Sequence, residues 1–156
     1  MATPQFKQLR RAYGFDEVAI VPGDATINPD QTNIGFKIED FTFTIPVVAS
    51  AMDAVTDVSF AILMSKLGGL AVLHLEGLQT RYDNPEEVLA RIAQSSETEI
   101  TPLLQKVYSQ PIKENLVAER IQSIKQGNAV CAVSVTPANA KRLSSIAAES
   151  GADILV

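Results

Sequence analysis

Four residues of this sequence combine a side chain suited to ligand chemistry with a place at the end of an apolar run. Ser50, Met52 and Asp53 follow the run Ile45 to Ala49, and His74, the single histidine, lies near the end of a second run. A hydroxyl and a polarizable thioether in one turn suit a flat base or a ribose. Imidazole exchanges protons near neutral pH. These residues are therefore candidates for a ligand-binding site.

Each candidate also has a structural interpretation. Ser50 is a residue type typical of turns, and Met52 could fill the apolar top of a core. Asp53 could lie at the edge of a pocket or simply order the turn by accepting hydrogen bonds from backbone N–H groups. No second histidine or matched carboxylate accompanies His74, so a metal site is not predicted. We expect His74 to form a hydrogen bond at the pocket edge rather than to act in catalysis.

The single cysteine, Cys131, is tempting as a nucleophile. It lies inside the apolar run Ala129 to Val135, where burial would raise the pKa of the thiol and suppress its reactivity. We therefore predict that Cys131 fills the core and is not a nucleophile. One cysteine cannot form an internal disulfide, which suits a reducing compartment.

The elements that must position these side chains follow a strand–helix–strand pattern. Ile45 to Ala49 and Leu70 to Leu75 predict buried strands. The helix between them begins at Thr56 and Asp57 and ends at the glycine pair 68–69. Two fully apolar strands joined by a helix favour a parallel sheet covered on both faces. In parallel barrels ligands bind where the loops leave the carboxyl ends of the strands, which is where residues 50–53 lie.

The same pattern continues toward the end of the chain. It predicts a helix over Glu114 to Gln126, a strand over Ala129 to Val135, a helix over Pro137 to Ser150 and a fourth strand from Ala152. The last apolar run reaches the final residue without a turn or a charge after it. We therefore expect the sequence to be the N-terminal piece of a longer protein.

Two regions depart from this alternation of strands and helices. In the arm formed by residues 1–44, Glu17 to Val21 resembles a strand, and the alternating residues 36–43 predict a small hairpin that turns near Glu39 and Asp40. The hairpin is expected to cap a sheet. Residues 76–113 form an unusually long connection, in which we predict a short helix over Asn84 to Gln94, with Asn84 as its cap, followed by a polar stretch.

Composition excludes several classes of protein. The 156 residues are 46% hydrophobic and 20% charged, an ordinary globular composition that excludes disorder and fibrous repeats. The net charge of -5 argues against a basic surface for nucleic acid. No run approaches the roughly 20 apolar residues of a membrane span, and no apolar stretch follows the basic N-terminus as a secretory signal requires. We expect a cytoplasmic protein with no nucleic-acid or membrane partner.

The stretch 44–74 resembles the first strand–helix–strand unit of the IMP dehydrogenase/GMP reductase family. The family has a Pro-led apolar strand, a Ser-x-Met-Asp-x-Val-Thr turn, an apolar helix, Gly-Gly and a strand that ends in His. The matching residues are Pro46, Ser50, Met52, Asp53, Val55, Thr56, Gly68, Gly69 and His74. Residues 13–34 and 129–156 are similar to the family more loosely. The 76–113 connection is too short for the regulatory cystathionine-synthase-type repeats, as in the GMP reductases and in the IMP-dehydrogenase-related branch. The opening RRAYGFDEVAIVPG, residues 10–23, is more similar to that related branch.

The resemblance implies a (β/α)8 TIM barrel, of which residues 45–156 would form about the first half, as one portion of a single catalytic domain. It implies NAD-dependent oxidation of IMP to XMP in guanine nucleotide synthesis, with Ser50 and Met52 lining the purine pocket. The family's cysteine nucleophile is expected outside this segment. The resemblance also implies potassium near the cysteine loop, largely bound by other residues, and a homotetramer or octamer.

Other functions remain open from the sequence. A GMP reductase would use the same covalent chemistry with NADPH and release ammonia. A fragment that binds nucleotide weakly or has only a structural role belongs to a different class. An unrelated phosphate-binding barrel, such as a flavin or sugar-phosphate enzyme, would show no preference for purine nucleotides.

Overall fold

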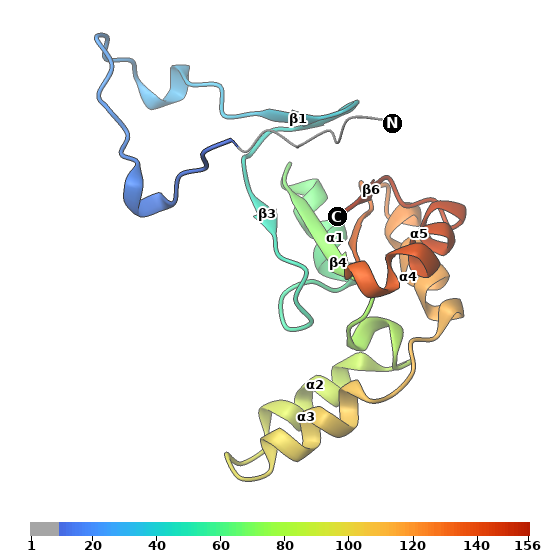
Figure 1. The fold of residues 1–156 in the computed structure, drawn as a ribbon. Coiled ribbons are helices and arrows are strands. Elements are labelled where there is room, and N and C mark those ends of the chain that lie inside the picture. The colour runs from blue at the N-terminus through green and yellow to red at the C-terminus, as the bar shows by residue number, and fades with distance from the viewer. Residues whose placement is uncertain (1–9) are drawn as a thin grey trace, which may run out of the picture. The chain divides into compact units, whose positions relative to one another are not determined.

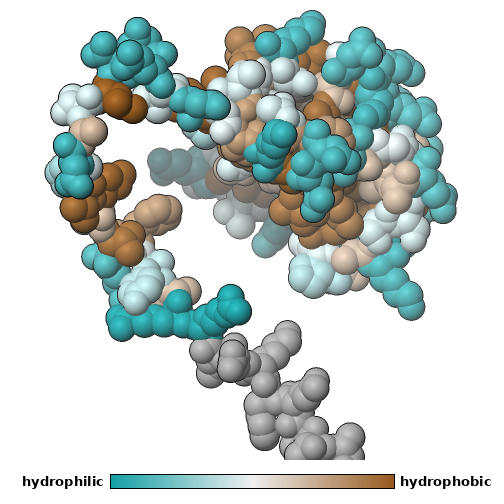
Figure 2. All heavy atoms as spheres, turned by 90° about the horizontal axis from the view of Figure 1, so that it is seen from above, coloured by the Kyte–Doolittle hydropathy of each residue, from teal (hydrophilic) through white to brown (hydrophobic). Residues whose placement is uncertain are grey.

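The computed structural model describes residues 10–156, which belong to two compact units that divide after Asn33. Residues 10–33 contain two short 3-10 helices, η1 (Phe15–Glu17) and η2 (Pro29–Gln31). The strand predicted over Glu17 to Val21 is wrong: Glu17 ends η1, residues 18–21 have no regular secondary structure, and residues 10–33 contain no strand that could pair with them. Ile20 in this segment is fully exposed. Figure 2 shows hydrophobic residues on the surface of the arm.

Four parallel strands form the sheet of the second unit, residues 34–156. They are β3 (Val48–Ala49), β4 (Leu70–His74), β5 (Ala132–Ser134) and β6 (Ile154–Leu155), and they lie side by side in sequence order. The predicted parallel sheet is confirmed, although each strand is shorter than its apolar run. Sequential parallel strands joined by helices are the arrangement found in part of a (β/α) barrel.

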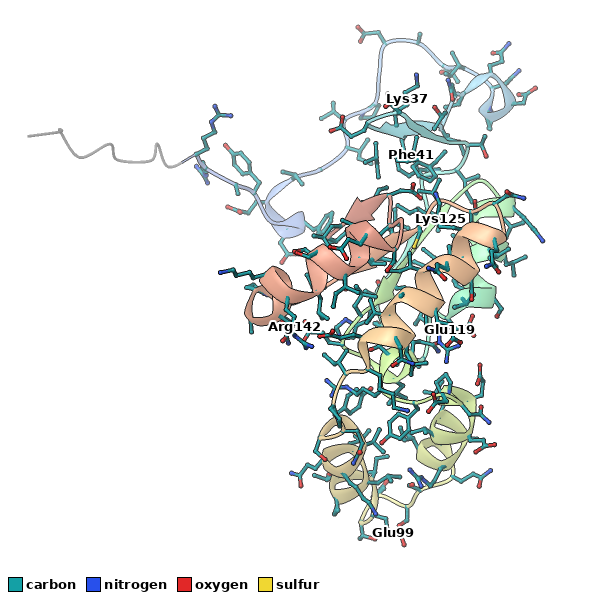
Figure 3. The ribbon with its side chains drawn as sticks, turned by 90° about the vertical axis from the view of Figure 1, so that its right-hand side faces the viewer. Lys37, Phe41, Glu99, Glu119, Lys125 and Arg142 are labelled. Carbon is teal, nitrogen blue, oxygen red and sulfur yellow. The ribbon has the colours of Figure 1, made fainter. Side chains whose placement is uncertain are left out.

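Three helices cover one face of this sheet: α1 (Val58–Lys66), α4 (Glu114–Gln126) and α5 (Pro137–Glu149). They pack on one another and on the strands to form the main core (Figures 1 and 3). Its fully buried side chains include Leu73, Val117, Ile121, Val133 and Leu143. All three helices lie where the sequence predicts them, to within one or two residues at their ends.

A small antiparallel hairpin packs against the other face. It consists of β1 (Phe36–Ile38) and β2 (Phe41–Phe43) and turns at Glu39, whose φ is 49°. The rings of Phe36 and Phe43 stack with centroids 4.8 Å apart. Phe43 is buried in a second cluster with residues of β4 and β5. The predicted hairpin that caps the sheet is therefore confirmed.

The edges of the sheet differ from the prediction of fully buried strands. Val48 in β3 is 50% exposed and Leu155 in β6 is 49% exposed. Each of these strands has a neighbour on one side only, so half of its surface has nothing to pack against. The inner strands β4 and β5 are buried as expected.

The long connection after β4 forms a pair of helices that extends from the sheet (Figure 1). The 3-10 helix η3 (Leu78–Thr80) precedes α2 (Pro85–Ala93) and α3 (Ile100–Tyr108), and the loop at the tip of the pair carries Glu99 (Figure 3). Leu78, Val88 and Val107 are buried between these elements. The sequence predicts α2 but not α3. Asn84 does not cap α2 through its side chain, which instead donates to Glu87 Oε1 at 2.6 Å.

Candidate functional site

The turn after β3, residues 50–53, is held by hydrogen bonds within the segment that leads into α1. Thr56 is buried, and its hydroxyl donates to the backbone oxygen of Ser50 at 2.9 Å. The backbone N–H groups of Val55 and Thr56 both donate to the oxygen of Met52 at 2.9 Å. Asp57 caps α1 by accepting from the N–H of Phe60. The turn thus projects its side chains from the carboxyl end of β3, and Met52 is 56% exposed.

Asp53 connects this turn to two segments that are distant in sequence. Its Oδ1 atom accepts a hydrogen bond from the N–H of Leu78 at 2.8 Å, and its Oδ2 atom accepts one from the hydroxyl of Tyr108 at 2.7 Å. A Cβ atom on Gly77 would lie 2.0 Å from Oδ1, so only glycine leaves room for the carboxylate. Asp53 therefore ties its own turn to the turn after β4 and to the end of α3, because its bonds go to those segments and not to N–H groups of its own turn.

A hollow of about 370 Å³ opens between the turn and the helix pair. Its wall is formed by Met52, Asp53, Ala54, His74, Leu89, Ile92, Leu104 and Tyr108. Its size and its apolar wall with a few polar groups are typical of sites for small molecules. Three of the four residues singled out from the sequence share this wall. Ser50 is exposed and lies outside it.

His74 lies at the carboxyl end of β4, in register with Ser134 of β5. Its Nδ1 atom is 3.4 Å from the Ser134 hydroxyl oxygen. Within residues 10–156, no group of three or more His, Cys, Asp or Glu side chains lies close enough together to hold a metal ion. The histidine is thus placed at the edge of the hollow with a neutral polar neighbour.

Glu76, which the sequence analysis did not single out, occupies the N-terminus of α5. Its carboxylate accepts from the N–H of Thr136 at 2.5 Å and from Asn139 Nδ2 at 2.7 Å. Partial burial alone would raise the pKa of this carboxyl group. The hydrogen bonds from Thr136 and Asn139, with a smaller effect of His74, outweigh burial and hold the pKa below its ordinary value. The positive end of α5 is therefore already occupied by a carboxylate.

The variant Glu76→Gln should lower the free energy of unfolding by about 1 kcal/mol at neutral pH, because a charged cap of α5 is lost. Since the folded-state pKa of Glu76 is lowered, this stabilisation is present above the ordinary value of 4.5 and disappears as the pH falls through the lowered value. Urea unfolding of both proteins across this range should show their difference narrowing toward acid. A difference that stays constant with pH would contradict the account.

Cys131 is fully buried directly before β5. Burial raises the pKa of its thiol to about 12, with a further rise from the Asp153 carboxylate and partial opposition from Lys125. Its N–H donates to Asp153 Oδ2 at 2.8 Å. A thiol in this setting is a poor nucleophile. The prediction that Cys131 is a core residue is confirmed.

A second hollow, of about 510 Å³, lies along α2 and is lined by Tyr82, Asp83, Asn84, Glu87, Val88 and Arg91. It contains none of the residues at the carboxyl ends of the strands. Because ligands of parallel α/β proteins bind at those ends, the hollow beside Met52 is the stronger candidate despite its smaller volume.

The helix pair supplies a part of the site that was not predicted from the sequence. Leu89, Ile92, Leu104 and Tyr108 all lie in the connection after β4. One signal was available: Leu103, Leu104, Val107 and Tyr108 recur at helical spacing, which predicts one apolar face. No local pattern indicates that this face would meet the turn after β3.

The fold and the site together are those of a parallel α/β protein with a hollow at the carboxyl edge of its strands. The IMP dehydrogenase / GMP reductase domain matches residues 12–156. The chain therefore belongs to the IMP dehydrogenase/GMP reductase family. The resemblance noted in the sequence is confirmed.

Individual relatives show how far the similarity extends. An uncharacterized oxidoreductase of Mycolicibacterium smegmatis is 34% identical over 152 residues, which cover 94% of this chain and 40% of that protein. The inosine-5'-monophosphate dehydrogenase of Methanocaldococcus jannaschii is 37% identical over 67 residues, which cover 43% of this chain and 14% of that protein. The chain thus spans less than half the length of the relatives that it matches.

A solved structure has a closely similar fold. The crystal structure of the IMP dehydrogenase/GMP reductase-like protein from Corynebacterium glutamicum superposes with a TM-score of 0.83 at 28% identity. The match covers 94% of this chain and 41% of that one. Within the part of the chain that the structure describes, no helix is long and apolar enough to cross a membrane.

Proposed function

We propose that the whole protein, meaning this chain with any residues that extend it, oxidises IMP to XMP with NAD in guanine nucleotide synthesis. The observation that carries the proposal is the turn 50–53 at the carboxyl end of β3, which exposes Met52 over an apolar hollow in a chain of this family. In this proposal the Met52 thioether packs on the purine base and the Ser50 hydroxyl binds the nucleotide beside it. The remaining strands of a (β/α)8 barrel would complete the pocket.

The described residues contribute binding rather than bond making. The N-terminus of α5, a natural place for a phosphate, is occupied by the Glu76 carboxylate, which would repel one. The phosphates of NAD therefore do not fit here and are assigned to residues outside the described chain, as is potassium. A homotetramer or octamer in the cytoplasm is likewise part of the proposal, and it rests on family membership.

Replacing Cys131 with alanine should leave the turnover of the whole protein unchanged within about twofold, and should lower the free energy of unfolding by about 1 kcal/mol through loss of packing. The reason is that the thiol is buried and its pKa is raised to about 12. Steady-state kinetics and denaturant unfolding of the same preparation measure both effects. Loss of turnover in a folded Cys131→Ala protein would show that Cys131 takes part in the chemistry.

Two assays on the whole protein test the proposed activity. NADH should form from IMP and NAD, and the absorbance of NADPH should not fall when GMP is added. The reverse result would establish a GMP reductase, the other activity for which the matched domain is named. Absence of both activities, with no calorimetric binding of IMP, would favour a structural role. Equal binding of unrelated sugar phosphates would favour a different phosphate-binding barrel.

A further inference from the structure

The hydrogen bond between Tyr108 and Asp53 joins the helix pair to the candidate site. The two residues are 55 positions apart in sequence, and their oxygen atoms are 2.7 Å apart. Tyr108 is the last residue of α3, while Asp53 directly follows Met52. The connection after β4 therefore reaches back to the turn after β3, which it contacts beside the exposed thioether.

The Asp53 carboxylate is held at both of its oxygen atoms. Oδ1 accepts from the N–H of Leu78 at 2.8 Å, Oδ2 accepts from Tyr108, and Gly77 leaves the space in which the carboxylate lies. A carboxylate with two directed hydrogen bonds has little freedom to rotate. The backbone next to Met52 is consequently anchored to two segments outside its own turn.

The Tyr108 hydroxyl is suited to donate the hydrogen bond to Asp53. Its pKa is raised to about 12, mainly by burial and further by the bond to Asp53. The phenol thus keeps its proton, and remains a donor, at neutral pH. The acceptor of that bond is the Oδ2 atom of Asp53.

We propose that Tyr108 is a positioning residue for the nucleotide: through Asp53 it holds the turn 50–53 in the conformation that binds the purine. The inference rests on the proposed function, in which Ser50 and Met52 line the pocket. When the turn adopts its binding-competent conformation for a smaller fraction of the time, its apparent affinity for the nucleotide falls in proportion to that fraction. If loss of the bond leaves the turn competent for a tenth of the time, affinity falls tenfold.

Tyr82, which lies between η3 and α2 and packs against the cluster of the helix pair, provides a matched control. Its hydroxyl donates to the backbone oxygen of Val107 at 3.1 Å and does not contact Asp53. Tyr82→Phe and Tyr108→Phe each remove one phenolic hydrogen bond and keep the ring. Only Tyr108→Phe removes a hydrogen bond from the Asp53 carboxylate, which then keeps its bond from Leu78 alone.

The experiment compares the two variants with the wild-type whole protein. Calorimetric titration with IMP should give about tenfold weaker binding for Tyr108→Phe and unchanged binding for Tyr82→Phe. Hydrogen exchange of the unliganded proteins should be faster at residues 50–56 in Tyr108→Phe alone. In steady-state kinetics the KM for IMP should rise while kcat stays within about twofold.

The outcomes separate this inference from the proposed function. Unchanged binding and exchange in Tyr108→Phe, or equal losses in both variants, would overturn the positioning role while leaving the proposed function intact. A wild-type protein that fails to bind IMP would overturn the proposed function and, with it, the role assigned to Tyr108. Faster exchange at residues 50–56 in that case would leave Tyr108 only as an anchor of the turn.

Discussion

Replacing Gly77 with alanine is expected to lower the free energy of unfolding by about 2–3 kcal/mol and to weaken nucleotide binding by tenfold or more. The new Cβ atom would lie 2.0 Å from Asp53 Oδ1 and 2.6 Å from its Cγ. These distances are far shorter than van der Waals contact, so the carboxylate must move. It would then lose its bonds to Leu78 and Tyr108, and the turn would lose its anchors.

The effect of Gly77→Ala is steric and not one of backbone strain. Gly77 has φ of -88° and ψ of -162°, which alanine can adopt. Gly23 is a suitable control, because nothing lies within 4 Å of a Cβ atom built there. Denaturant unfolding and calorimetry should therefore find Gly23→Ala nearly unchanged. A Gly77→Ala protein as stable as the Gly23→Ala protein would refute the packing described at Asp53.

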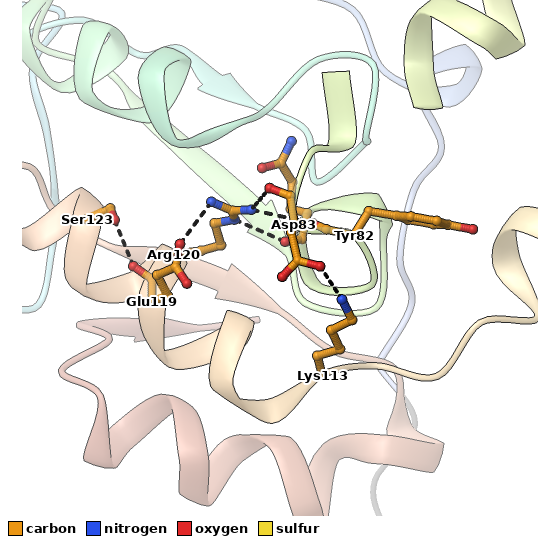
Figure 4. Close-up of polar contacts among 7 residues, drawn as sticks. Tyr82, Asp83, Lys113, Glu119, Arg120 and Ser123 are labelled. Atoms are coloured by element: carbon orange, nitrogen blue, oxygen red, sulfur yellow. Dashed lines mark hydrogen bonds and ion pairs between the residues drawn. The ribbon is translucent and has the colours of Figure 1, made fainter. Parts of the chain in front are cut away.

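The second large effect is expected at Arg120 in α4. Its guanidinium donates to the backbone oxygens of Gln79 at 3.1 Å, Tyr82 at 3.4 Å and Asp83 at 3.0 Å (Figure 4). The side chain is only 15% exposed. Arg120→Ala should lower the free energy of unfolding by about 2–4 kcal/mol, because three carbonyl groups, two of them in partly buried bonds, lose a charged donor.

Arg142 in α5 serves as the control for Arg120. It pairs with Glu114 at 2.8 Å, but its side chain is 48% exposed. Arg142→Ala removes the same side chain from an exposed ion pair and should change the free energy of unfolding by less than about 1 kcal/mol. Urea unfolding of both variants measures the contrast. Equal losses would mean that Arg120 does not hold the turn before α2 against α4.

The unit that presents the site could be predicted because its signals are local. The carboxylate of Asp57 accepts from the N–H of Phe60 and begins α1. Gly68, with φ of 87°, ends it. The unbroken apolar residues of β4 require burial on both faces. Each of these features is determined within a few residues of chain, so the pattern and the structure agree.

Helix α3 was not predicted, because a proline lies in its first turn and because its stability depends on packing against α2. Its third residue is Pro102, and a proline after a polar stretch suggests the end of an element. A proline in the first turn of a helix is tolerated, because the N–H groups there have no partner within the helix. The apolar face that includes Val107 then packs against α2. Tertiary packing, not local propensity, completes this helix.

The contacts that complete the site join residues too far apart for any local pattern. Asp53 reaches Tyr108 across 55 positions, and Glu76 reaches Thr136 across 60. Both carboxylates stand in loops that follow a strand, and their neighbours in sequence do not indicate which distant residues they bond to. Only the folded chain brings their partners to them, so sequence reasoning could locate the turn at 50–53 but not what anchors it.

The proposed function requires that the turn after β3 bind a purine nucleotide. The most direct test is calorimetric titration of the whole protein with IMP, comparing wild type with Ser50→Ala/Met52→Ala and with Leu67→Ala. Leu67 is 58% exposed, similar to Met52 at 56%, but lies at the far end of α1. The double variant should bind IMP at least about tenfold more weakly, because it loses the apolar contact of Met52. Leu67→Ala should bind IMP as the wild type does. Equal affinity of all three proteins for IMP would contradict the role proposed for this turn.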